Sequence, residues 1–239
     1  MTPVRCPIVE LRQYTLHTGQ RDVLIDLFDR EFVESQEALG MAILGQFRDL
    51  DDPDRFVWLR GFVDMPSRTE ALGRFYGGPV WRAHSREANA TMIDSDDVLL
   101  LRPVPGSQGF PAPAQPRPPA SHTERPVSLI AATICHRDRP VDDEFRETFA
   151  TQIGPALTEA GGSPLVCLQS EYAENTFPAL PVRAGEHVFV WFTRLGSAAD
   201  HDDYRRRRER AQPWRRLVTT LPRPPHELRL APTARSLLR

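Results

Sequence analysis

The feature that most restricts the fold of this chain is the spacing of its four tryptophans. Trp58 and Trp81 lie 23 residues apart, and Trp191 and Trp214 are separated by the same interval. The first tryptophan of each pair ends a Phe-Val-Trp triplet, and the second has a proline just before it and an arginine directly after it. Because tryptophan is rare, this correspondence predicts an internal duplication, so any fold assigned to one half must also suit the other.

A proline-rich segment separates the two halves. Residues 103–126 read PVPGSQGFPAPAQPRPPASHTERP, which leaves few side chains to bury and favours an extended connector. The chain has 239 residues, so each half has the length of one small domain. We therefore predict a first repeat over residues 1–104, a linker over 105–126 and a second, more divergent repeat over 127–239.

Each half shows the same order of strand and helix patterns. In the first half, residues 8–16 alternate like a strand, an apolar stripe with helical spacing follows, and residues 41–47 and 56–63 predict two more strands. A second helical region and a last strand at 98–101 complete the order βαββαβ, the ferredoxin-like plan with two helices on one face of an antiparallel sheet. Two such sheets can cover each other's bare face. We therefore predict an α+β fold in which two tandem ferredoxin-like repeats pack into a barrel with helices outside.

The first half resembles the NIPSNAP family. The residues that carry the resemblance are the opening ELRQYTLHTG and the stretch FVWLRGFVDMPSRTEALGRFYGGPVWRAHSREANATMIDSDDVLLLRP, which cover most of residues 8–104. The second half is similar to the same domain more weakly, through FVWF and the PWR element. The resemblance implies a tandem, bacterial-type member of the dimeric α+β barrel superfamily, which also holds cofactor-free monooxygenases and haem enzymes. Most bacterial proteins of this kind have no assigned reaction, so the resemblance implies little about function.

Composition excludes several kinds of chemistry. The sequence has no lysine and all 30 basic residues are arginine, which excludes Schiff-base and pyridoxal-phosphate enzymes and P-loop nucleotidases. No histidine pattern has metal-ligand spacing, so we expect no metal; haem stays open as a cofactor, although no axial histidine can be chosen. A net charge of −2, and a basic run at 205–208 offset by acidic neighbours, predict no nucleic-acid partner.

Hydropathy and cysteine usage bear on the location of the chain, and the two repeats bear on its assembly. No apolar run approaches the length of a bilayer span, and the charged N-terminal stretch lacks a signal-peptide pattern. Cys6, Cys135 and Cys167 are odd in number and form no CxxC pair, which suits a reducing compartment. We therefore expect a cytoplasmic protein with no membrane partner. The two repeats can cover each other's sheets within a monomer. A homodimer formed through the outward helices or a free sheet edge is the alternative.

Alternation along the strands selects the first set of candidate ligand-binding residues. One face of the first strand and of the strand that starts at Arg55 is aliphatic, and the other face is polar and aromatic. If the aliphatic faces pack under the helices, the other faces point into the barrel interior, where they suit a small-molecule pocket. The residues selected in this way are Glu10, Arg12, Tyr14, Trp58, Arg60 and, at the matching position of the second half, Trp191. The alternative is structural: the charges pair with one another and the tryptophans fill the core.

A long connection at residues 171–186 is the second candidate region. The matching hairpin in the first half is much shorter, and long loops on a scaffold often carry function. Tyr172, Asn175 and Phe177 lie in this connection and are candidates for closing over a barrel mouth. A plain surface excursion is the alternative.

Two functions follow from these expectations, and we favour the first. The first is a protein that binds a small molecule in the barrel interior; it leaves open a cofactor-independent enzyme of oxygenase, isomerase or lyase type, as the superfamily implies. In that case Tyr14 is the polar group and Arg60 the anion partner. The second is a non-catalytic interaction or scaffold protein. The sequence assigns no catalytic residue, substrate or reaction.

Overall fold

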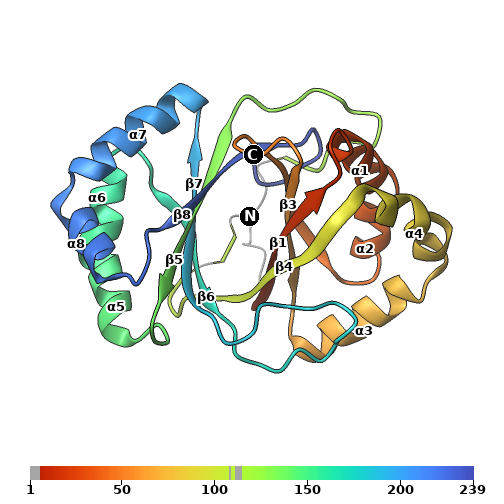
Figure 1. Ribbon diagram of the computed structural model, residues 1–239, viewed down its shortest axis with the longest axis horizontal. Helices are drawn as coiled ribbons and strands as arrows, with labels where there is room; N and C mark the ends of the chain where they lie inside the picture. The colour runs from red at the N-terminus through yellow and green to blue at the C-terminus, as the bar shows by residue number, and fades with distance from the viewer. Residues whose placement is uncertain (1–5, 108, 111–114) are drawn as a thin grey trace.

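Eight antiparallel strands close on themselves in the order β1-β3-β2-β8-β5-β7-β6-β4 (Figure 1). The computed structural model describes residues 6–107, 109–110 and 115–239. The strands are β1 (Ile8–Leu16), β2 (Ala42–Asp49), β3 (Arg55–Phe62), β4 (Met92–Pro103), β5 (Leu129–Arg137), β6 (Pro164–Ser170), β7 (His187–Leu195) and β8 (His226–Pro232). Closure of the barrel gives every strand two hydrogen-bonded neighbours, so these strands leave no open sheet edge in the described part of the chain.

Each repeat contributes one sheet with the same internal order, β4-β1-β3-β2 in the first repeat and β8-β5-β7-β6 in the second. Two seams join the sheets, β2 with β8 and β4 with β6, and each seam has three paired positions. The registers also correspond, because Arg12 lies opposite Trp58 in the first sheet and Thr133 lies opposite Trp191 in the second. The predicted α+β barrel of two ferredoxin-like repeats is therefore confirmed.

The helices of each repeat cover the outer face of its own sheet, on the right of Figure 1 for the first repeat and on the left for the second. The first repeat has α1 (Arg21–Leu27), η1 (Phe28–Phe32), α2 (Val33–Glu37), α3 (Met65–Tyr76) and α4 (Pro79–Thr91). The second has α5 (Asp143–Thr148), η2 (Phe149–Ile153), α6 (Gly154–Glu159), α7 (Ala198–Arg210) and α8 (Gln212–Thr220). In the described ranges, no helix combines the length and the apolar character needed to cross a membrane.

Local sequence explains how these helices begin and where they widen. The carboxylate of Asp64 accepts a hydrogen bond from the backbone N–H of Ser67 and so caps the start of α3, and Ser197 caps α7 in the same way. The first helix of each repeat contains one wider π turn, η1 or η2. A π turn rotates the residues after it relative to those before it, and it occurs at the same place in both repeats.

The barrel interior is filled mainly by aliphatic side chains. Val9 and Leu11 of β1, Leu99 and Leu101 of β4, and their equivalents on the other strands form one buried cluster there. The proline-rich segment contributes to it as well, because Phe110 is only 3% exposed and its ring centroid lies 5.9 Å from that of Phe192. This segment is thus part of the barrel core as well as a connector.

Replacing Phe110 tests this role of the connecting segment. Phe110→Ala should lower the free energy of unfolding by about 3–5 kcal/mol, because it removes buried contacts and leaves a cavity. Urea denaturation followed by tryptophan fluorescence measures the change. Gln115→Ala, at an exposed position of the same segment, should change the free energy by less than about 0.5 kcal/mol. Similar small effects for both variants would show that the segment only connects the two sheets.

Candidate functional site

The strand residues predicted to line the barrel interior face the helices instead. Tyr14 and Trp58 belong to the core between the first sheet and its helices, whereas the aliphatic residues beside them point into the barrel. The reason is space: the inside of an eight-stranded barrel is just wide enough for packed side chains, and here aliphatic layers fill it. The predicted orientation is therefore wrong for Glu10, Arg12, Tyr14, Trp58 and Arg60. They do lie together, as predicted, but on the other side of the sheet.

Glu10 binds three arginines at once. Its Oε2 accepts hydrogen bonds from Nη1 of Arg12 at 2.8 Å and from Nε of Arg60 at 2.7 Å. Its Oε1 accepts one from Nε of Arg68 at 2.6 Å. Glu10 and Arg12 come from β1, Arg60 from β3 and Arg68 from the first turn of α3, and each of the four side chains is at most 1% exposed. We call these four residues the Glu10 cluster.

Neutral polar groups hold the guanidinium groups in place. The amide oxygen of Gln36 accepts a hydrogen bond from Nη1 of Arg60 at 3.1 Å, and the amide nitrogen of Gln36 donates to the carbonyl of Phe32 at 2.9 Å. The hydroxyl of Tyr14 accepts from Nε of Arg12 at 3.0 Å. These contacts tie the cluster to α2, η1 and β1 and add no negative charge.

The Glu10 cluster carries an excess of two positive charges, since three guanidinium groups face one carboxylate. Within the described residues, three buried N–H groups in or beside the cluster lack a hydrogen-bond acceptor. They are Nη2 of Arg60, Nη2 of Arg68 and Nε1 of the neighbouring Trp58. Burial by itself would raise the pKa of Glu10, but the three arginines hold that pKa well below its ordinary value. Buried charge of this kind is costly unless a partner neutralises it.

Trp58 forms the aromatic wall of the cluster. The Cζ atoms of Arg12 and Arg60 lie 5.6 Å and 5.1 Å from its ring centroid, within the range of cation–π attraction. The rings of Phe28 and Tyr14 contact it edge-on, with centroids 4.8 Å and 5.8 Å away. Trp58 is therefore both a core residue and a neighbour of the charged groups.

The long connection between β6 and β7 covers this site. The side-chain oxygen of Asn175 accepts a hydrogen bond from Nη1 of Arg68 at 3.0 Å, and Thr176 contacts Thr69 of α3. The ring of Phe177 packs against Tyr76 with 6.1 Å between centroids. In Figure 1 the connection runs from β6 toward α3 of the other repeat. The expectation that it closes over the barrel mouth is wrong, because its contacts are with the helix side of the first sheet.

Tyr172 does not join Asn175 and Phe177 in this contact. It is half exposed, and its hydroxyl lies 2.8 Å from Nδ1 of His187, at the start of β7. The connection is anchored farther along, where Nη1 of Arg183 donates to Asp97 of β4 at 2.9 Å. Only the middle of the loop therefore reaches the Glu10 cluster.

The positions that match Glu10 and Arg60 carry no charge in the second repeat. Ala131 lies opposite Thr193, as Glu10 lies opposite Arg60 in the first repeat. Trp191, the counterpart of Trp58, is fully buried in the core between the second sheet and its helices, apart from the Glu10 cluster. It is a core residue of the second repeat.

A separate charged group in the second repeat is balanced. Arg208 of α7 forms an ion pair with Glu227 of β8, and Nε2 of His201 lies 2.9 Å from Oε1 of Glu227. Burial would raise the pKa of Glu227, but hydrogen bonding to His201 and the charge of Arg208 lower it to about 2. Across the described ranges, no group of three or more His, Cys, Asp or Glu residues is arranged to hold a metal ion.

Comparison with known proteins identifies the half that contains the Glu10 cluster. Residues 9–108 match the family model described as NIPSNAP. This half is a NIPSNAP domain. All four residues of the cluster fall inside the matched range, so the charge excess is a property of this domain. The curated proteins include no match to the chain.

Solved structures share the fold of the whole chain. A candidate monooxygenase from Fusobacterium nucleatum covers 96% of this chain and 94% of its own, with 10% identity and a TM-score of 0.57. A candidate monooxygenase from Lactobacillus acidophilus covers 95% and 94%, with 13% identity and a TM-score of 0.52. At these identities the likeness shows the fold alone. A NIPSNAP family protein from Agrobacterium tumefaciens is 21% identical over 41% of this chain and 92% of its own, with a TM-score of 0.38.

Strand alternation could not select Arg68 and Gln36, two residues of the site in the NIPSNAP domain, because they lie on helices. A signal for Arg68 exists in the sequence. Arg68, Leu72 and Phe75 follow helical spacing, and all three are buried on one face of α3. An arginine within an apolar helical stripe needs a buried partner, which Glu10 supplies. Gln36 carries no comparable signal.

Acid should destabilise the NIPSNAP domain through Glu10. The folded-state pKa of Glu10 lies below its unfolded value of about 4.3, so its contribution is complete above that value and is lost as the pH falls toward the folded pKa. The unfolding free energy of the wild type should therefore drop between about pH 5 and pH 2. Glu10→Gln should flatten this dependence and cost about 3–5 kcal/mol at pH 7, because three arginines then lack their carboxylate.

Urea denaturation at a series of pH values measures both effects. Glu70→Gln, which removes an exposed carboxylate from the same domain, serves as the matched control and should follow the wild type. Glu227 titrates in the same acidic range, so a remaining, smaller slope in Glu10→Gln is expected. A Glu10→Gln variant as stable as the wild type at pH 7 would contradict the assignment.

Proposed function

We propose that the chain binds a small anionic molecule at the Glu10 cluster, between the first sheet and α3. The observation that carries this proposal is the excess of two buried positive charges, with Nη2 of Arg60 and Nη2 of Arg68 lacking acceptors. The second repeat has the same fold and keeps its buried charges balanced, so the fold itself does not require the excess. An anion that accepts these N–H groups would neutralise it.

The donors suit a carboxylate or a phosphoryl group. A guanidinium group offers parallel N–H donors that match the two oxygens of such a group. The indole N–H of Trp58 adds a third donor, and the rings of Trp58 and Phe62 provide apolar walls next to Arg60. These features favour a small acid that carries an apolar body.

The ligand lies outside the barrel in this proposal. The described interior is filled by an apolar cluster, with residues such as Leu59 and Val190 on opposite sheets, and this cluster offers an anion no charged partner. Because the Glu10 cluster is closed from solvent, a ligand must enter by displacing the 171–186 connection, whose Asn175 occupies one N–H of Arg68. The loop would then act as a cover for the site.

Catalysis at the same site is a second candidate function, and the position of Tyr14 favours it. The hydroxyl of Tyr14 accepts a hydrogen bond from Arg12, so its own proton is available to a molecule bound beside it. Burial raises the pKa of Tyr14, which keeps the hydroxyl protonated and suits an acid rather than a base. A cofactor-independent oxygenase, isomerase or lyase would use such a group, whereas a scaffold protein would not.

We also propose a cytoplasmic location. Cys6, Cys135 and Cys167 are free thiols, and two of them are buried in the barrel and helix cores. A protein that keeps all its cysteines reduced suits a reducing compartment.

Substitution of Arg68 separates a binding role from a structural one. We expect Arg68→Met to weaken binding of carboxylic or phosphoric acids by about tenfold or more, because it removes a charged hydrogen-bond donor. The ligand-free variant should lose at most about 1–2 kcal/mol, because the lower charge excess offsets the hydrogen bond that Oε1 of Glu10 loses. A thermal-shift screen of small acids measures both quantities. Saturating ligand should raise the melting temperature of the wild type by about 5–10 °C.

Arg74→Met is the matched control, since Arg74 is exposed on the same helix. It should leave ligand binding and melting temperature unchanged. If no acid shifts the wild type and Arg68→Met is several kcal/mol less stable, the arginines serve structure and the scaffold function gains support.

Shortening the loop tests its role as a cover. Deletion of Asn175–Leu180 should speed ligand dissociation and weaken affinity, because it removes the contacts over Arg68 and α3. Surface plasmon resonance with an acid found in the screen measures both. Asn175→Ala tests the contact without shortening the chain, and Tyr172→Phe, outside the cover, is the control. Unchanged kinetics in the deletion would make the loop a plain surface excursion.

A further inference from the structure

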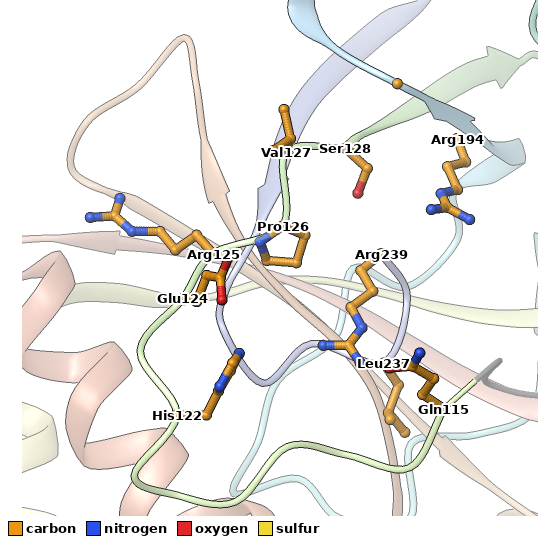
Figure 2. Close-up of a pocket in the computed structure, with 11 residues that line it drawn as sticks. Gln115, His122, Glu124, Arg125, Pro126, Val127, Ser128, Arg194, Leu237 and Arg239 are labelled. Atoms are coloured by element: carbon orange, nitrogen blue, oxygen red, sulfur yellow. The ribbon is translucent and has the colours of Figure 1, made fainter.

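A second positively charged space lies beside the connecting segment, near the start of β5 (Figure 2). It is an open groove of about 600 Å³. Gln115, His122 and residues 124–128 form one wall, Arg194 at the end of β7 forms another, and Leu237 and Arg239 complete it. None of these residues takes part in the Glu10 cluster or its cover.

The charges in this groove are unbalanced. Arg125, Arg194 and Arg239 line it together with one acidic side chain, that of Glu124. Within the described residues, neither Arg194 nor Arg239 forms a salt bridge or a side-chain hydrogen bond. In Figure 2 the side chain of Arg239 runs toward Leu237, and Arg194 lies on another side of the groove. Guanidinium groups that line one space without partners favour an anion there.

An uncharged donor faces the same space. The hydroxyl of Ser128 is buried and has no hydrogen-bond partner in the described part of the chain. In Figure 2 this hydroxyl points toward the groove from the start of β5. A buried hydroxyl normally finds a partner, so its orientation is a second and independent sign that a polar group belongs in the groove.

We propose that this groove binds a phosphate-bearing small molecule. Arg194, Arg239 and Ser128 approach from different directions, and a phosphate group presents acceptor oxygens in several directions, whereas a carboxylate presents two in one plane. Pro126 and Leu237 give the groove an apolar side where the organic part of a phosphate ester can lie. The groove is open, but a ligand reaches the buried hydroxyl of Ser128 only if the atoms around that hydroxyl move aside.

This site is independent of the proposed function. It uses other residues and other elements, and the two sites can be tested separately in the full chain.

Isothermal titration with inorganic pyrophosphate and with phenyl phosphate tests the proposal. We expect saturable binding that weakens about tenfold in Arg194→Gln and in Arg239→Gln, and less strongly in Ser128→Ala. Affinity should fall at higher salt concentration, because the contacts are exposed charges. Arg68→Met should keep this binding event, which separates it from the Glu10 cluster.

Arg125→Gln is the matched control. Arg125 also borders the groove, but in Figure 2 its side chain points away from the space between Arg194 and Arg239. It should change affinity less than about twofold. An equal loss in Arg125→Gln would indicate diffuse attraction and overturn the proposal. So would the absence of saturation up to about 10 mM probe, or unchanged binding in both Arg194→Gln and Arg239→Gln.

Discussion

Closing eight strands into a barrel sorts the side chains of this protein by size and charge. The enclosed space is just wide enough for packed aliphatic groups, which Val9, Val57 and Leu99 supply from neighbouring strands. The longer side chains of the same strands must therefore face outward, where the helices bury them. Buried arginines need partners, so the helix side of the first sheet becomes the place where Glu10, Gln36 and the backbone are drawn into one hydrogen-bonded group. The site is thus a consequence of the closure.

The two repeats place different charges on the same backbone. Trp58 and Trp191 occupy the same register, yet the residues around them differ in charge: Glu10 and Arg60 face the helices in the first sheet, Ala131 and Thr193 in the second. An unbalanced buried charge lowers stability. A barrel whose interior is shared by both sheets can tolerate that cost in one repeat, because the other repeat and the common core remain conventionally packed. The common core can therefore support a charge imbalance in one half.

Much of the fold could be predicted from the sequence, because its strongest signals are local. The tryptophan pairs and the alternation of the strands depend on short spacings, and the structure retains them in both sheets. Alternation also brought Glu10, Arg12 and Arg60 together correctly. It could not tell which face lies inside, because a period of two defines two faces without naming the buried side of a closed barrel. That choice depends on all eight strands at once.

The covering loop shows the limit of prediction more sharply. Its length indicated an insertion, but nothing near it in the sequence indicated where it goes. Asn175 binds Arg68, which lies 107 positions earlier in the chain. Arg68 itself is visible as an arginine within an apolar helical stripe, yet its partner on β1 becomes evident only when α3 is placed on the sheet. Contacts of this range follow from topology, which single-residue patterns do not contain.

In each repeat, the connection between the second and third strands contacts the other repeat. The connection after β6 reaches the first repeat, and the short turn after β2 reaches the second, where the N–H of Leu50 donates to the carbonyl of Arg229 at 2.8 Å and Asp51 binds the side chain of Arg229. Each half is therefore completed by a piece of the other. A gene split between the repeats would separate the first half from the cover of its own charged cluster. A change on α3 and a change in the distant loop therefore act on the same contact, although 107 positions separate Arg68 from Asn175.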